Sequence, residues 1–173
     1  LWNRAKELEK KDHIKRTVTL DYQYRTHPEL GNFVSEMFYA PYGESFKSTL
    51  PAANFTQNIS QLPYRWVNIP ASKGGTGKIG ASKCRKAEAD YIVNTLKEYL
   101  NDEQYADLNF GVISFYRGQA DLIEKILGSA YNKKRVRIGT VDQFQGMEFD
   151  VIFLSTVRSG IDFSSVDFSR LED

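Results

Sequence analysis

The stretch that decides the fold is DVIFLSTV, residues Asp150–Val157. It is a nearly continuous apolar run bounded by charged residues, a pattern typical of a strand that is buried on both faces of a parallel sheet. Strands of an antiparallel sheet more often alternate apolar and polar residues, because one face meets water. The stretch therefore predicts a parallel sheet.

Outward from this strand, the sequence alternates between strand-like and helix-like segments. Further strands are predicted at 17–22, 64–69, 109–115 and 136–141, and apolar residues recur at helical spacing within 30–38, 89–100 and 122–127. We expect the apolar stripe of 30–38 to be core, and Gly128 to end the last helix. This alternation predicts an α/β fold with a mostly parallel sheet flanked by helices.

Composition limits the size and class of the protein. A chain of 173 residues with 41% hydrophobic residues suits one ordinary domain with a real core. Because 23 Lys+Arg balance 22 Asp+Glu, any phosphate site must consist of a few placed groups. Cys84 is the only cysteine, and His13 and His27 are too far apart for a local ligand pair, so we expect no disulfide and no metal site.

The chain ends also carry expectations. No signal-peptide core and no membrane-length apolar stretch occurs, so we expect an intracellular, cytoplasmic protein with no membrane partner, and the nucleus is an alternative compartment if its source is eukaryotic. The chain starts without Met and stops without a closing element. We therefore expect a fragment of a longer polypeptide.

A glycine-rich run, GGTGK at Gly74–Lys78, looks like a phosphate loop. It departs from that motif because Ser72 stands where the first Gly is required and Ile79 where a metal-binding Ser or Thr is required. We interpret it as a flexible, basic surface turn inside a loop-rich, insertion-like segment, 40–83.

Donor-rich clusters follow three of the predicted strands. They are QYRTHP at Gln23–Pro28, SFYRGQ at Ser114–Gln119 and TVDQFQGMEFD at Thr140–Asp150. The carboxyl ends of parallel strands meet at one edge of a sheet, so these clusters should share a rim. Their Arg, Gln, Tyr, Ser and Thr side chains suit phosphate contact, but no paired acid and nucleophile is evident. The rim is predicted to bind an anion without cleaving it alone.

Two of these clusters resemble signature motifs of superfamily 1 helicases. QYRxHP and TVDxFQGxExDVIFLSxVR, the latter at Thr140–Arg158, are similar to motifs of the 5′-to-3′ translocating group that includes the nonsense-mediated-decay RNA helicase. SFYRGQ resembles the short motif between them, with Phe115 in place of the usual Pro, and Thr26 stands where Met is usual. The resemblance implies a second, C-terminal RecA-like motor domain of three layers spanning 1–173 and truncated before the last helicase motif.

The resemblance also implies roles for individual residues. Arg25 would reach the γ-phosphate of ATP, which with Mg²⁺ would be bound mainly by the absent first RecA-like domain of the same polypeptide; a planar, always-charged guanidinium suits that task. Residues implied at the nucleotide are Gln23, Tyr24, Gly146 and Glu148, the last at the ribose. Residues implied at single-stranded DNA or RNA are Ser114, Tyr116, Gln119 and Thr140. Residues implied in coupling are Asp142, Gln145 and Arg158.

The predicted function is the second motor domain of an ATP-dependent helicase or translocase, in which the isolated chain does not hydrolyse ATP. An alternative is a catalytically silent nucleic-acid-binding α/β module, and a flavodoxin-like regulatory domain is disfavoured because no glycine-rich loop follows the first strand. Individual residues keep structural alternatives. His27 would brace the turn before Pro28, Glu148 could be solvated, Tyr116 could pack at the sheet edge, and the basic run from Lys133 to Arg137 could be a solvated turn.

Overall fold

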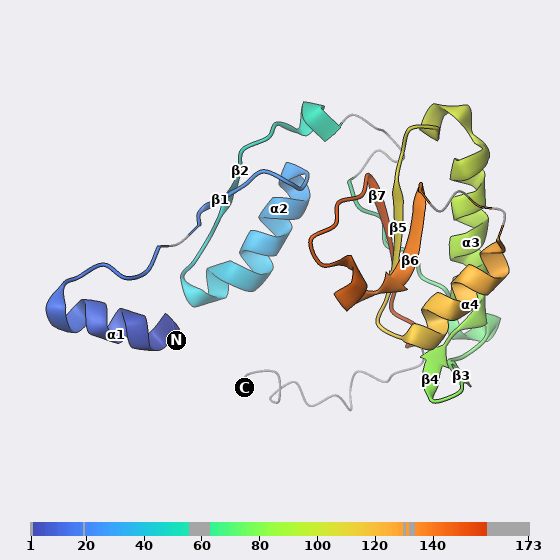
Figure 1. Cartoon of the computed structure of the whole chain (residues 1–173), viewed down its shortest axis with the longest axis horizontal. Coiled ribbons are helices and arrows are strands. Elements are labelled where there is room, and N and C mark those ends of the chain that lie inside the picture. Colours follow the sequence, from blue (N-terminus) through green and yellow to red (C-terminus); the bar gives the residue numbers. More distant parts are fainter. Residues whose placement is uncertain (1, 19, 56–62, 130, 132–133, 159–173) are drawn as a thin grey trace. The chain divides into compact units, whose positions relative to one another are not determined.

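The computed structural model describes residues 2–18, 20–55, 63–129, 131 and 134–158 (Figure 1). The chain divides into two compact units, Leu1–Val67 and Asn68–Asp173. The boundary lies inside the segment 40–83 that the sequence predicts to be insertion-like.

The described residues of the first unit form two α-helices and one short pair of strands. Its elements are α1 (Trp2–Asp12), β1 (Tyr22–Gln23), α2 (Pro28–Val34) and β2 (Lys47–Ser48), with a π-helical turn at Ser35–Tyr39 and 3₁₀ turns at Ala40–Tyr42 and Ala52–Phe55. β1 pairs with β2 in parallel. The strand predicted at 17–22 is therefore wrong in extent, since β2 offers a ladder only two residues long. Val18 and Leu20, which lie within the predicted strand, are exposed.

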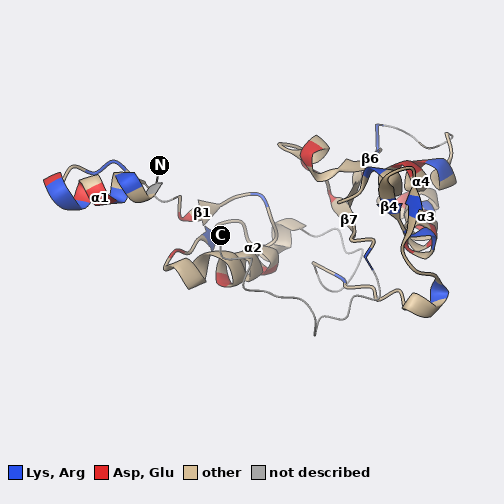
Figure 2. Ribbon diagram, turned by 90° about the horizontal axis from the view of Figure 1, so that it is seen from below, with Lys and Arg blue, Asp and Glu red and all other residues tan. Residues whose placement is uncertain are grey.

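Helix α1 carries charges of both signs along its length, as Figure 2 shows. Lys10 and Lys11 lie in its last turn, where positive charge complements the helix dipole. Glu9 lies in α1, and its carboxylate accepts hydrogen bonds from residues beyond the end of the helix. The donors are the backbone N–H groups of Arg16 and Thr17 and the Thr17 hydroxyl. Glu9 thus fixes the chain that leaves α1.

Helix α2 forms where the apolar spacing predicts a helix, but its stripe is not core. Phe33, Met37 and Phe38 are 53%, 59% and 62% exposed. The expectation of burial is wrong because the described elements of the first unit, two-residue strands and short turns, offer too little apolar surface to cover the stripe. Phe33 and Phe38 contact each other edge to face, with ring centroids 6.4 Å apart.

The second unit contains a hairpin and an alternating run of helices and strands. Its elements are β3 (Gly77–Ile79), β4 (Ser82–Cys84), α3 (Lys86–Asn101), β5 (Phe110–Ser114), α4 (Arg117–Leu127), β6 (Val136–Thr140) and β7 (Val151–Ser155), with 3₁₀ turns at Ala71–Lys73, Glu103–Tyr105 and Val141–Phe144. Residues 64–70 form neither helix nor strand, so the strand predicted at 64–69 is wrong.

Strands β5, β6 and β7 form a parallel sheet in the order β6-β5-β7. Helices α3 and α4 lie on one side of it (Figure 1). Tyr99 of α3 stacks on Phe110 of β5 with ring centroids 6.1 Å apart. The fully buried core residues between these layers are Ala89, Val93, Leu96, Phe110, Val112 and Ile123. The predicted helices at 89–100 and 122–127 are confirmed, and Gly128 ends α4 with a φ of 84°.

The opposite face of the sheet is only partly covered within the second unit. A Cβ at Gly111 would lie 3.1 Å from both Phe144 and Phe149, so this glycine admits the segment after β6 onto the sheet. Ile152 and Leu154 of β7 remain 55% and 56% exposed. The prediction that β7 is buried on both faces is therefore wrong, because the segment from 144 to 149 covers β5 and not β7.

A parallel sheet with flanking helices, in this order along the chain, is a RecA-like α/β fold. The predicted fold class is confirmed. Within the described part of the chain, no helix combines the length and the apolar character needed to cross a membrane.

Candidate functional site

The loop after β1 is organised by the side chain of Gln23. Its Oε1 accepts the backbone N–H groups of Arg25 and Thr26 at 2.9 and 2.8 Å. Its Nε2 donates to the Thr26 carbonyl at 2.8 Å and to Ser48 Oγ at 2.6 Å. Gly31 makes this possible, since a Cβ there would lie 2.3 Å from Ser48 Oγ. Gln23 therefore gives the segment that carries Arg25 a defined backbone.

Arg25 and Tyr24 lie on this loop and are exposed. His27 closes the loop by capping α2, because its Nδ1 accepts the N–H of Glu29 at 3.2 Å. The His27 ring also meets Phe55 edge to face at 5.4 Å. The predicted role of His27 in bracing the turn before Pro28 is confirmed.

In the second unit, the carboxyl ends of the three parallel strands meet at one rim. Ser114 of β5 is in register with both Thr140 of β6 and Ser155 of β7. The Thr140 N–H donates to Gln143 Oε1 at 2.9 Å within a capping box, which sets the start of the turn after β6. Two of the three predicted donor clusters therefore share this rim, and the third, Gln23–Pro28, belongs to the first unit.

Two of the residues predicted to contact nucleic acid lie beneath the rim. Gln119 is fully buried, and its Nε2 donates to Ser155 Oγ at 3.1 Å while its Oε1 accepts the Arg85 N–H at 2.7 Å. Ser114 is 1% exposed and accepts the Tyr116 N–H at 3.2 Å. The polar atoms of both residues are bonded inside the domain, and direct contact of either residue with a strand stays a prediction.

Tyr116 is half-buried at the rim and lies beside two cations. Arg158 Nε donates to the Tyr116 hydroxyl at 2.6 Å, and its guanidinium carbon lies 6.0 Å from the ring centroid. Lys83 Nζ lies 5.9 Å from the same centroid. These distances fit cation–π contacts. Tyr116, Arg158 and Lys83, which we call the rim cluster, thus combine an aromatic face with positive charge.

The segment between β6 and β7 holds the other predicted residues. Asp142, Gln145, Gly146 and Glu148 are exposed, and Gly146 has a φ of 79°. Phe144 and Phe149 flank this loop and lie against each other at 5.2 Å. Because both rings also contact the position of Gly111, the loop projects from a fixed base.

A buried ion pair at the start of α3 lies outside the set of residues predicted from the sequence. Arg85 is 4% exposed and donates to the carbonyls of Ile69, Pro70 and Gly74. Its guanidinium lies 3.9 Å from the Glu88 carboxylate. The sequence did contain a signal for this pair, because Arg85 and Glu88 are three residues apart at the start of an amphipathic helix.

The GGTGK run is not a phosphate loop in this structure. Gly77–Ile79 pairs with Ser82–Cys84 as an antiparallel hairpin, and Gly80 at its turn has a φ of 58°. The basic run before β6 is also structural in part, since Arg135 donates to the carbonyls of Tyr105 and Leu108. Lys133 lies outside the described residues.

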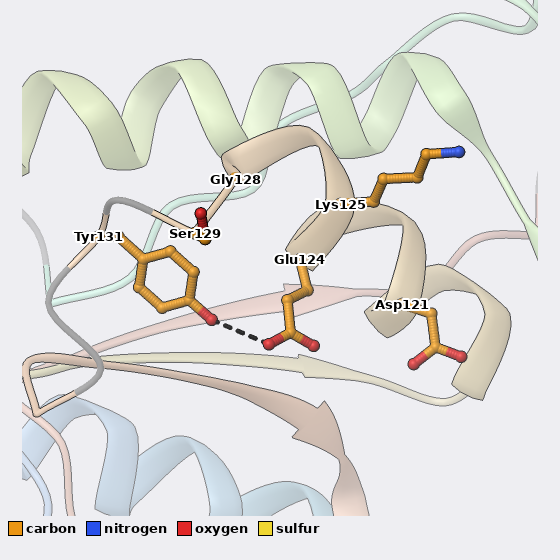
Figure 3. Close-up of a pocket in the computed structure, with 6 residues that line it drawn as sticks. All are labelled: Asp121, Glu124, Lys125, Gly128, Ser129 and Tyr131. Atoms are coloured by element: carbon orange, nitrogen blue, oxygen red, sulfur yellow. Dashed lines mark hydrogen bonds between the residues drawn. The ribbon is translucent and has the colours of Figure 1, made fainter.

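A hollow of about 390 Å³ lies at the far end of α4 from the rim (Figure 3). Tyr131 donates to Glu124 across it at 3.1 Å, and burial together with that carboxylate raises the pKa of Tyr131. Its lining residues are Asp121, Glu124, Lys125, Gly128, Ser129 and Tyr131. The described residues contain no cluster of His, Cys, Asp or Glu able to hold a metal ion.

Comparison with known proteins identifies the family. A family model described as an AAA domain matches residues 3–171. The chain belongs to this AAA domain family. The AAA domain is 32% identical to Helicase sen1 of Schizosaccharomyces pombe over 93% of the chain and 10% of that protein. It is also 31% identical to the ATP-dependent helicase NAM7 of Saccharomyces cerevisiae, over 82% of the chain and 15% of that protein.

A third relative is the regulator of nonsense transcripts 1 homolog of Neurospora crassa, 32% identical over 86% of the chain and 14% of that protein. The AAA domain thus spans between a tenth and a sixth of the length of these relatives. Together they support the assignment to superfamily 1 helicases that the two signature motifs indicate.

Proposed function

We propose that this AAA domain is the second motor domain of an ATP-dependent helicase or translocase, in which Arg25 completes an ATP site held mainly by another domain. The observation that carries the proposal is the Arg25 loop, where the Gln23 amide fixes the backbone on both sides of the arginine. A fixed backbone reduces the ordering that the exposed Arg25 side chain needs at the moment of reaction, which favours phosphoryl transfer.

The residues predicted at the nucleotide would form one part of a nucleotide site and not a complete site. Arg25 and Tyr24 would approach the phosphates and base, Gln23 would shape this side of the pocket by holding their loop, and Gly146 and Glu148 would lie at the sugar. The described residues contain neither a phosphate loop nor an acidic metal cluster. ATP with Mg²⁺, when bound, supplies the phosphoryl group that is cleaved, and Arg25 would stabilise charge on its oxygens.

The rim of the sheet would hold single-stranded DNA or RNA. Tyr116 offers a face for stacking, and Thr140 offers a hydroxyl for a phosphate oxygen. Ser114 and Gln119 would stabilise the rim through their buried hydrogen bonds to Tyr116 and Ser155. Asp142, Gln145 and Arg158 would link the strand side to the nucleotide side through the segment between β6 and β7.

The test is Arg25→Ala in the longest native polypeptide that carries this chain. We expect nucleic-acid-stimulated ATP hydrolysis to fall by about a thousandfold, because an arginine at this position in phosphoryl transfer is worth that order. Binding of a labelled oligonucleotide should change little. Arg25→Lys should recover only part of the loss, since an ammonium lacks the planar pair of donors.

Arg65→Ala is the matched control, because Arg65 is an exposed arginine of the same unit outside the loop. We expect it to hydrolyse ATP at the normal rate. Unchanged hydrolysis in Arg25→Ala, with normal oligonucleotide binding, would instead favour a catalytically silent nucleic-acid-binding module.

A further inference from the structure

The chain makes a strained turn at Val157, directly after β7. Val157 has a φ of 71°, which is rare for a β-branched residue. The Arg158 N–H donates to the Thr156 carbonyl at 2.8 Å, so this is a γ-turn of the uncommon, strained kind. Val157 is fully buried. Such conformations persist where surrounding contacts impose them, and they concentrate at functional sites.

Two side chains from distant parts of the sequence hold this turn. The Glu88 carboxylate accepts the Val157 N–H with both oxygens at 3.2 Å. The Thr76 hydroxyl, at the base of the β3–β4 hairpin, donates to the Val157 carbonyl at 3.0 Å. Both backbone polar groups of Val157 are therefore bonded to side chains, and the unfavourable φ is compensated.

Glu88 is itself fixed from two directions. Its Oε1 accepts the Ser155 hydroxyl at 2.9 Å, and its Oε2 lies 3.9 Å from the Arg85 guanidinium. The side chains of Arg85 and Glu88 are only 5% and 12% exposed. A buried carboxylate with this many partners has little freedom to move. Its position therefore determines the position of the Val157 N–H.

The turn decides where the next side chain points. Arg158 follows Val157 and donates to the Tyr116 hydroxyl at 2.6 Å. Without the turn, a chain leaving β7 in an extended conformation would carry Arg158 along the strand direction, away from the start of α4. The rim cluster thus depends on a backbone conformation that Val157 does not adopt by preference.

We propose that Glu88 is a positioning residue for strand binding: it imposes the γ-turn at Val157 and so holds Arg158 against Tyr116. This rests on the proposed function, in which the rim binds a single strand. Arg158 would meet a phosphate while Tyr116, oriented by Arg158 and Lys83, stacks on a base. Glu88 touches neither and acts through the turn.

The first experiment measures the affinity of the native polypeptide for a labelled oligo(dT) and a labelled oligo(U) by fluorescence anisotropy. We expect Glu88→Gln to weaken binding by about tenfold, the order that corresponds to losing one charge-assisted hydrogen bond. Glutamine has one acceptor oxygen instead of two, and its NH₂ group would face the Val157 N–H. Glu98→Gln, on an exposed position of the same helix, is the matched control and should bind normally.

The decisive variant adds Val157→Gly to Glu88→Gln. Glycine adopts a φ of 71° without steric cost, so the turn no longer needs Glu88 and strand affinity should return. A purely structural role for Glu88 predicts the opposite, because removing the fully buried Val157 side chain lowers stability further. Recovery of affinity in a less stable double variant is therefore specific to positioning.

Thr76→Val provides an independent test at an exposed position, should Glu88→Gln fail to fold. It removes only the hydroxyl that holds the Val157 carbonyl, and we expect affinity to fall by about threefold. Normal affinity in both single variants, or a loss in Glu88→Gln that the added glycine does not recover, overturns the positioning role. If the wild-type protein binds neither oligonucleotide, the proposed function fails and this inference fails with it.

Discussion

At the scale of single residues, Gln23 uses its side-chain amide for four hydrogen bonds within the loop after β1 and to β2. That satisfies both the donors and the acceptor of the amide. Gly31 is part of the same arrangement, since a Cβ there would lie 2.8 Å from Gln23 Nε2 as well as against Ser48. The loop that carries the exposed Arg25 therefore depends on a glycine in the helix that follows it.

Gly31→Ala should separate function from stability. The atoms that a new methyl group would meet are the ends of flexible side chains, so they can move, and alanine favours the helix by about 1 kcal/mol. We expect unfolding temperature to stay close to normal while stimulated ATP hydrolysis falls, because Gln23 leaves the loop. Thermal unfolding and a steady-state ATPase assay measure the two. Gly75→Ala, where a Cβ meets nothing, is the control; equal activity in the two variants would contradict the role given to Gln23.

At the scale of elements, helices in this chain do more than cover the sheet. One side of α3 fills the core through Val93 and Leu96, and its first turn supplies Glu88 to the end of β7. In α1, Glu9 and Asp12 hold the segment that follows the helix. In both helices, carboxylates near a helix end decide the path of another part of the chain.

The end of α1 should respond to acid. Hydrogen bonds from the Arg16 N–H and from Thr17 lower the pKa of Glu9 below its ordinary value of 4.5, and the Arg16 side chain lowers the pKa of Asp12. A lowered pKa in the folded state means that these contacts stabilise the helix end above the ordinary pKa. That stabilisation is lost as the pH falls from 4.5 through the lowered value. Carbon-detected NMR titration of the Glu9 carboxyl would follow it.

Glu9→Gln should remove the part of this transition that belongs to Glu9, as seen in the amide resonances of Arg16 and Thr17. Glu7→Gln, an exposed change on the same helix, should leave it in place. A Glu9 carboxyl that titrates at or above 4.5 would contradict the contacts described here.

At the scale of the whole molecule, a net charge of +1 leaves little attraction for a polyanion beyond the placed groups. The rim cluster supplies Lys83 and Arg158 next to Tyr116. A strand held by so few cations should dissociate only gradually as salt rises, in contrast to proteins with extended basic faces. This is the behaviour expected of a surface that supplies only a few contacts to the strand.

We therefore expect the 173-residue chain alone to bind oligo(dT) with a shallow salt dependence, with a slope of log K against log salt of about −1.4, because each of the two cations contributes about −0.7 on a single strand. Lys83→Ala should reduce the size of this slope by about 0.7. Lys97→Ala, exposed on α3, should not change it. The same preparation should not hydrolyse ATP. A steep slope, or robust turnover, would show that the chain carries a larger site than the one described.

Much of the second unit could be predicted from sequence because its signals are local. The spacing of Ala89, Val93 and Leu96 reports a helix face whatever lies opposite it, and the helix and its burial are confirmed. The predicted length of the strand at 17–22 and the predicted burial of Phe33 and Met37 were wrong. Those properties depend on which surfaces meet, and apolar character alone does not specify a partner.

The candidate site divides in the same way. The sequence by itself determined the α/β class, the parallel strands and the chemistry available at their ends. These properties follow from the alternation of strand-like and helix-like segments and from the types of side chain, both of which are local features of the sequence. Only the tertiary structure decided that Gln119 and Ser114 are buried, that Gln23 holds the Arg25 loop, and that Glu88 accepts the N–H of Val157 in its left-handed conformation. The Gln119–Ser155, Gln23–Ser48 and Glu88–Val157 contacts all join residues far apart in sequence, and such contacts exist only once packing has closed around them.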